Sequence, residues 1–175
     1  MEYSVPSFEN YEAILQHYRD FLNGKINECA THGGPVKEEI LPQLLAINEG
    51  QIIAVDSQPG MLEKECKQRA YLDCLMKKDN YDRLFSKLLQ TELVLFANPY
   101  QHSEESVHHI LVTLEYEEPY TKLPIGLCND MAQILSSTAL EYREAIMEDL
   151  WQVRILDPVW GRATYLFDQV VAALY

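Results

Sequence analysis

Ser57 and its neighbours form the stretch of this sequence best placed to do chemistry. Asp56 and Ser57 follow an apolar run, and Gln58, Pro59 and Gly60 come directly after them. A serine hydroxyl at the end of a strand can contact a ligand, and beside a general base it can act as a nucleophile. No Gly-x-Ser-x-Gly nucleophile elbow surrounds it. Three interpretations stay open: a turn whose side chains bind backbone N–H groups, a ligand contact, or catalysis.

Histidines and glycines offer little further chemistry. His102, His108 and His109 lie close together in the sequence. Adjacent residues of a strand point to opposite faces, so His108 and His109 cannot bind one ion together, and a zinc site would need distant cysteines or carboxylates. The phosphate-binding patterns Gly-x-x-x-x-Gly-Lys and Gly-x-Gly-x-x-Gly are both absent. We therefore expect neither a metal site nor a site for a nucleoside triphosphate or a dinucleotide.

Carboxylates gather near the middle of the chain. They are Glu104, Glu105, Glu115, Glu117 and Glu118. Acid–base chemistry would need one of them to be buried, which would raise its pKa. Nothing in the sequence requires that burial, so we expect a solvated acidic rim.

The charge balance restricts the partners. Lys and Arg number 14 against 27 Asp and Glu, a formal net charge of −13. A nucleic-acid binder needs a basic face, and an anionic membrane attracts basic segments, so neither partner is expected. The purely apolar runs, such as Leu93-Val94-Leu95-Phe96-Ala97, are far too short to span a bilayer.

The cysteines and the first residues predict a compartment. Cys29, Cys66, Cys74 and Cys128 are scattered and form no Cys-x-x-Cys pair. Residues 1–4 show neither the basic nor the apolar region of a secretory signal. We expect reduced thiols and a cytoplasmic location.

Helices alternate with strands along the chain, and these elements must position the residues above. An apolar stripe at spacings of three and four predicts an amphipathic helix over residues 8–22. Ser7 is its expected N-terminal cap, and Gly24 is expected in a left-handed conformation just after its end. A short helix is predicted over residues 38–47, with Pro42 in its first turn. The next predicted elements are strands at 51–56 and 69–76, a helix from Asp79, and strands at 92–97 and 107–117.

The last third of the chain reads as helical. After a loop from Pro119 to Pro124, helices are predicted over residues 138–147 and 162–174, with a break at Asp157-Pro158. This alternation predicts the α/β (α+β) class, as a single domain in which helices flank a mixed sheet.

Three segments carry a family resemblance. The first consists of Asn48-Glu49-Gly50, an apolar strand and Asp56-Ser57-Gln58-Pro59. The second is Gln68-Arg69-Ala70-Tyr71-Leu72-Asp73, and the third is Ile155-Leu156-Asp157-Pro158-Val159. They resemble "N-x-x-G-I-L-T-I-N-S-Q-P", "Q-K-A-Y-L-E" and "V-V-D-P-V" of the C-terminal regulatory domain of methylenetetrahydrofolate reductase. Small uncharacterised bacterial and viral proteins share the first two. The resemblance assigns residues 35–175 to that domain, after an N-terminal helix and loop at 1–34.

The resemblance implies binding without catalysis. That regulatory domain binds S-adenosylmethionine and inhibits a separate catalytic barrel, which 175 residues cannot hold. The family's serine is kept as Ser57, but Ala54 and Arg154 stand where the family has threonines. Val36 and Lys37 stand near its Glu-Thr pair. Each hydrogen bond lost in a polar site costs about 1–3 kcal/mol.

The sequence thus predicts a non-catalytic metabolite-binding or regulatory module, with S-adenosylmethionine or a nucleoside-like ligand as its candidate. The expected ligand-binding residues are Asp56, Ser57, Gln58, Tyr71 and Asp157. Ser57 and Tyr71 are expected to border one pocket. The alternative is a protein-interaction or accessory protein, bacterial or viral, that keeps the fold and has lost the ligand site.

Overall fold

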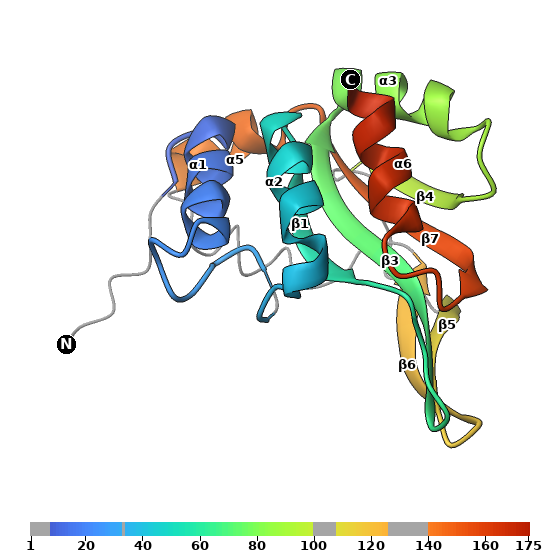
Figure 1. Ribbon diagram of the computed structural model, residues 1–175. Helices are drawn as coiled ribbons and strands as arrows, with labels where there is room; N and C mark the ends of the chain where they lie inside the picture. The colour runs from blue at the N-terminus through green and yellow to red at the C-terminus, as the bar shows by residue number, and fades with distance from the viewer. Residues whose placement is uncertain (1–7, 33, 100–107, 126–139) are drawn as a thin grey trace.

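The long strand β3 (Cys66–Lys77) organises the structure because it pairs with four other strands. The computed structural model describes residues 8–32, 34–99, 108–125 and 140–175 (Figure 1). The other strands are β1 (Ile53–Gln58), β2 (Met61–Leu62), β4 (Val94–Pro99), β5 (His108–Glu115), β6 (Glu118–Ile125) and β7 (Leu150–Trp160). The helices are α1 (Tyr11–Leu22), η1 (Glu38–Ile40), α2 (Leu41–Glu49), α3 (Lys78–Leu88), α5 (Leu140–Met147) and α6 (Tyr165–Leu174).

The strands form two connected parts. The main sheet has the order β1-β3-β7-β4 and uses residues 69–77 of β3. The arm has the order β2-β3-β5-β6 and uses residues 66–68 of β3, and it projects from the main sheet (Figure 1). A register shift between Arg69 and Tyr71 marks the passage from one part to the other.

Helices flank this sheet in one domain, as expected for the α/β (α+β) class. Every described strand pair is antiparallel, where a mixed sheet was expected. β3 and β4 do run in the same direction and are joined by α3, as in a β-α-β unit. They are not neighbours, however, because β7 from the end of the chain lies between them.

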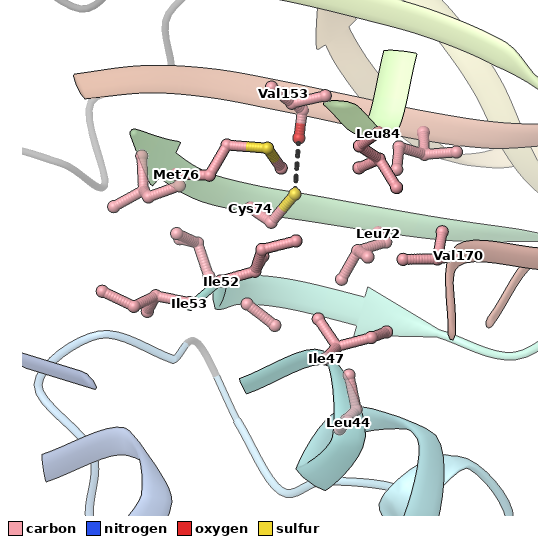
Figure 2. Close-up of a cluster of buried hydrophobic side chains, with 14 of the residues drawn as sticks. Leu44, Ile47, Ile52, Ile53, Leu72, Cys74, Met76, Leu84, Val153 and Val170 are labelled. Carbon is pink, nitrogen blue, oxygen red and sulfur yellow. Dashed lines mark hydrogen bonds between the residues drawn. The ribbon is translucent and has the colours of Figure 1, made fainter. Parts of the chain in front are cut away.

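Helices α2, α3 and α6 cover one face of the main sheet, which we call the helix face. Its core joins side chains of β3 and β7 to those of the helices: Leu72, Cys74, Met76 and Val153 with Leu44, Ile47, Leu84 and Val170 (Figure 2). The Cys74 thiol donates to the Val153 carbonyl at 3.2 Å, so the only polar atom of that side chain is paired. This apolar cluster is the main source of stability, since burial of such side chains contributes about 1.5–3 kcal/mol each.

The β5–β6 hairpin lies against the opposite face, which we call the hairpin face. Tyr71 and Leu156 of the main sheet pack with Val112 and Leu123 of the hairpin. The Arg154 guanidinium also donates to the carbonyl of Pro124 on β6, at 2.6 Å. The main sheet is thus covered on both faces.

The predicted ends of the first helices are largely confirmed. Gly24 has φ +68°, the left-handed conformation expected just after α1, and Pro42 lies in the first turn of α2. Asn10 caps α1 through a bond from the Ala13 N–H at 2.8 Å. The predicted start at residue 8 is wrong, because α1 begins at Tyr11 after the Asn10 cap. Ser7, the expected cap, lies outside the described residues.

Two expectations for the second half are wrong. Residues 150–160 form strand β7 within the third expected to be helical, although α5 and α6 appear on either side of it. Residues 118–125 form strand β6 rather than a loop. β6 pairs with β5 alone among the described strands, and such an edge position tolerates its two prolines.

Candidate functional site

The register between β1 and β3 decides which predicted residues share a face. Gln58 pairs with Tyr71 and Asp56 pairs with Asp73, so these four side chains lie on the hairpin face. Ser57 pairs with Leu72 and lies on the helix face. The expectation that Ser57 and Tyr71 border one pocket is therefore wrong, because neighbouring residues of a strand alternate between faces.

Pro59 and Gly60 bend the chain but do not reverse it. β1 and β2 both pair with β3, and the chain reverses only at residues 63–65, where the Glu63 N–H donates to the Cys66 carbonyl at 2.8 Å. Gly60 packs against the segment before α6, and its N–H donates to the Ala163 carbonyl at 3.2 Å. Ser57 thus lies inside strand β1 and not in a turn.

Tyr71 and Asp56 form a hydrogen-bonded pair. The Tyr71 hydroxyl donates to the Asp56 carboxylate at 2.8 Å. Burial raises the pKa of Tyr71 well above its usual value, and the nearby carboxylates of Asp56 and Asp73 raise it further. The phenol is consequently a neutral donor that holds Asp56 in place.

A buried ion pair lies next to them. The Arg154 Nε donates to the Asp73 carboxylate at 2.9 Å, and the Gln152 amide donates to both carboxylate oxygens at 3.0 and 3.2 Å. Burial raises the pKa of Asp73, while Arg154 and Gln152 oppose that rise. In the sequence, the one trace of this cluster is that Gln152 and Arg154 alternate with apolar residues.

Asp157 has a structural environment. It is fully buried, and Arg162 donates to it twice, at 2.8 Å from Nε and 2.5 Å from Nη2. The Val159 N–H donates to the same carboxylate at 2.9 Å. These bonds fix the segment that leads from β7 into α6, so the carboxylate serves as an anchor within this chain.

A groove lies beside the end of β1, and we call it the β1 groove. Its volume is about 630 Å³, within the range of small-molecule sites. The Gln68 amide donates to the Pro59 carbonyl at 2.7 Å across its wall. The lining residues are Lys37, Glu38, Glu39, Gln58, Pro59, Met61 and Gln68. Of the predicted ligand-binding residues, Gln58 lines this groove.

One family model matches residues 11–175, from the first residue of α1 to the end of the chain. The chain belongs to the DUF6919 family. That family is described as a domain of unknown function. No curated protein matches the chain. Asp56, Gln58, Tyr71, Asp73, Arg154 and Asp157 all lie inside the DUF6919 match.

Ser57 meets a histidine on the helix face. Its side chain is 2% exposed, and its Oγ lies 3.4 Å from Nε2 of His32. The other ring nitrogen lies 2.7 Å from the Gly34 carbonyl, which can only accept, so Nδ1 carries the proton and Nε2 accepts from Ser57. Burial lowers the pKa of His32. Ser57 therefore fixes the segment after α1 to β1.

Acid is expected to weaken this contact. Because the folded state lowers the pKa of His32, the unfolded chain binds the extra proton first, and stability falls as the pH drops below about 6.5. We expect the free energy of unfolding to decrease between pH 8 and pH 5.5, and to decrease less in His32→Asn. Urea unfolding at both pH values measures this. His17, whose pKa burial also lowers, is kept in both proteins; equal pH dependence in the two would contradict the expectation.

The remaining expectations concern surface groups. Among the described residues, no group of three or more His, Cys, Asp or Glu could hold a metal ion. His108 and His109 are exposed on β5, and His102, Glu104, Glu105 and Cys128 lie outside the described residues. In the arm, the Lys67 ammonium lies 2.5 Å from the Glu117 carboxylate. No helix in the described part of the chain is long and apolar enough to cross a membrane.

Proposed function

We propose that this DUF6919 chain is a non-catalytic module that binds a small zwitterionic metabolite in the β1 groove. S-adenosylmethionine or a related nucleoside-like ligand is the first candidate. The observation that carries the proposal is that both charge signs and two amides line one groove. Lys37 can pair with a carboxylate, and Glu38 and Glu39 can pair with an ammonium or a sulfonium group.

The amides of the groove supply orientation. Each glutamine offers one acceptor oxygen and two N–H donors, so Gln58 and Gln68 can form hydrogen bonds to polar groups of a ligand. One donor of Gln68 already bonds to Pro59, and this fixes its amide before a ligand binds. A site fixed in advance binds more tightly because less freedom is lost on binding.

The family resemblance supports the same place. Gln58 and Pro59 belong to the first resembling segment and Gln68 to the second, and the Gln68–Pro59 bond joins the two. Lys37 stands near the family's Glu-Thr pair and lines the groove. Arg154, which replaces a family threonine, is committed to Asp73. The proposed site therefore includes residues of the matching segments and does not include Arg154.

The hydroxyl groups of the region favour binding over catalysis. Ser57 is buried on the helix face against His32, and the Tyr71 hydroxyl is bonded to Asp56. Both hydroxyl groups are hydrogen-bonded to other residues of the chain, so we propose no nucleophile at this site.

A thermal-shift screen tests the proposal. The probes are S-adenosylmethionine, S-adenosylhomocysteine, folates and common nucleotides. A probe at a hundred times its Kd should stabilise the fold by about 2.7 kcal/mol, which raises Tm by about 5–11 °C. Gln58→Ala should reduce the shift at a fixed probe concentration. Gln90→Ala, which removes an exposed glutamine after α3, is the matched control. No shift with any probe, or an equal shift in Gln58→Ala, would contradict the proposal.

Exposed apolar residues on the arm favour the second candidate, a protein-interaction module. Leu62, Tyr116 and Tyr120 are 63%, 71% and 68% exposed. Such residues are typical anchors of protein interfaces. A photo-crosslinking residue in place of Leu62 tests this function. It should give a discrete adduct in cells that make the protein, which the same residue in place of the exposed Lys87 should not give.

A further inference from the structure

A second cavity lies beyond the C-terminal end of α1, and we call it the His32 pocket. Its volume is about 460 Å³, and its lining includes Phe21, Asn27, Glu28, His32 and Pro35. The region that resembles the methylenetetrahydrofolate reductase domain begins at residue 35. Apart from Pro35, this pocket is thus built from residues that precede that region.

The rings of the pocket form a fixed wall. The His32 ring stacks on Tyr18, with centroids 6.0 Å apart and an interplanar angle of 21°. Phe21 lies 5.8 Å from the same imidazole, tilted by 35°. The bonds of His32 to Gly34 and Ser57 hold both ring nitrogens. Since Tyr18 is fully buried behind them, Phe21 and His32 are the rings that meet a ligand.

The rim of the pocket selects for hydrogen-bond donors. Glu28 offers a carboxylate and Asn27 an amide, and both residues are exposed. Lys25, three residues before Glu28, is paired with Asp20 at 2.8 Å. With a net charge of −13 on the chain, a phosphate would be repelled. The rim therefore suits a neutral or cationic ligand that donates N–H groups.

We propose that the His32 pocket is a second binding site, which takes a planar nitrogen heterocycle that bears an amino group and no phosphate. The ring stacks on Phe21 and His32, and its amino group donates to Glu28. Stacking of a base on an aromatic side chain is strong enough to carry such binding, because its removal by alanine lowers affinity about 5- to 150-fold. The site is independent of the β1 groove.

Fluorescence of 2-aminopurine riboside tests this proposal, because stacking quenches the base. We expect saturable quenching by the full chain, with affinity about tenfold weaker in Phe21→Ala. Glu28→Gln should also weaken binding, and this exposed position keeps the test valid if Phe21→Ala folds poorly. The 5′-monophosphate of the same nucleoside should bind more weakly.

Gln58→Ala separates the two sites. It should leave the quenching unchanged, whatever the outcome for the β1 groove. The absence of quenching, equal affinity in Glu28→Gln and the wild type, or loss of quenching in Gln58→Ala would each overturn the proposal.

Discussion

Replacement of Arg154 by methionine is expected to lower the free energy of unfolding by about 3–5 kcal/mol. The variant leaves the Asp73 carboxylate buried without its counter-charge, and it removes the bond to the Pro124 carbonyl that ties the hairpin to the main sheet. The loss should be smaller at pH 5 than at pH 8, because burial already raises the pKa of Asp73 and a protonated carboxyl needs no cation. Urea unfolding at the two pH values measures both effects.

Lys25→Met is the matched control for Arg154→Met. It removes a basic side chain from an ion pair that is largely exposed to solvent, Lys25–Asp20. Such surface pairs contribute about 0–1 kcal/mol, so this variant should unfold much like the wild type. If both variants lost the same free energy, the Asp73–Arg154 pair would not be the buried support that the structure indicates.

Gly60→Ala is expected to cost about 1–3 kcal/mol of stability. A Cβ at this position would lie 2.5 Å from the carbonyl oxygen of Arg162 and 2.8 Å from its carbonyl carbon. These are backbone atoms held by the Arg162–Asp157 bonds, so they cannot move aside cheaply. The bend between β1 and β2 shapes one wall of the β1 groove, and the variant should therefore also bind the groove's ligand more weakly.

Gly34→Ala provides the comparison for Gly60→Ala. A Cβ there would meet nothing within 4 Å. The substitution should be neutral or should stabilise by about 0.4–1 kcal/mol, because alanine restricts the unfolded chain. Thermal unfolding of the two variants gives the result directly, and equal midpoints would show that the contact of Gly60 with Arg162 is unimportant.

Local patterns were sufficient to predict several elements. The apolar stripe of α1 is a property of consecutive residues, and Tyr11, Ile14, Leu15, Tyr18 and Leu22 are indeed buried. Pro42 and Gly24 have conformations that depend only on their own backbone. Gln58 was expected to bind a ligand because of the family resemblance, and the structure places it in β1 beside a groove.

Long-range contacts determined what local patterns missed. β7 carries Gln152 and Arg154 in its buried centre, and their partner Asp73 is about 80 residues away. When that partner is not known, two polar residues in this segment argue against a buried central strand. Ser57 was expected in a turn because Pro59 and Gly60 follow it. Ser57 instead lies within β1, and Gly60 packs against Arg162, a hundred residues later.

The central claim is that the β1 groove binds a zwitterionic metabolite, and amide NMR tests it most directly. S-adenosylmethionine is titrated into the ¹⁵N-labelled chain. The proposal predicts saturable shifts concentrated at residues 37–39, at the non-proline residues of 58–61 and at Gln68, and weaker binding in Gln58→Ala. Shifts that avoid these residues, or none up to millimolar ligand, would contradict it for this ligand. If none of the probes of the thermal-shift screen gave saturable shifts at these residues, the proposal would be contradicted altogether.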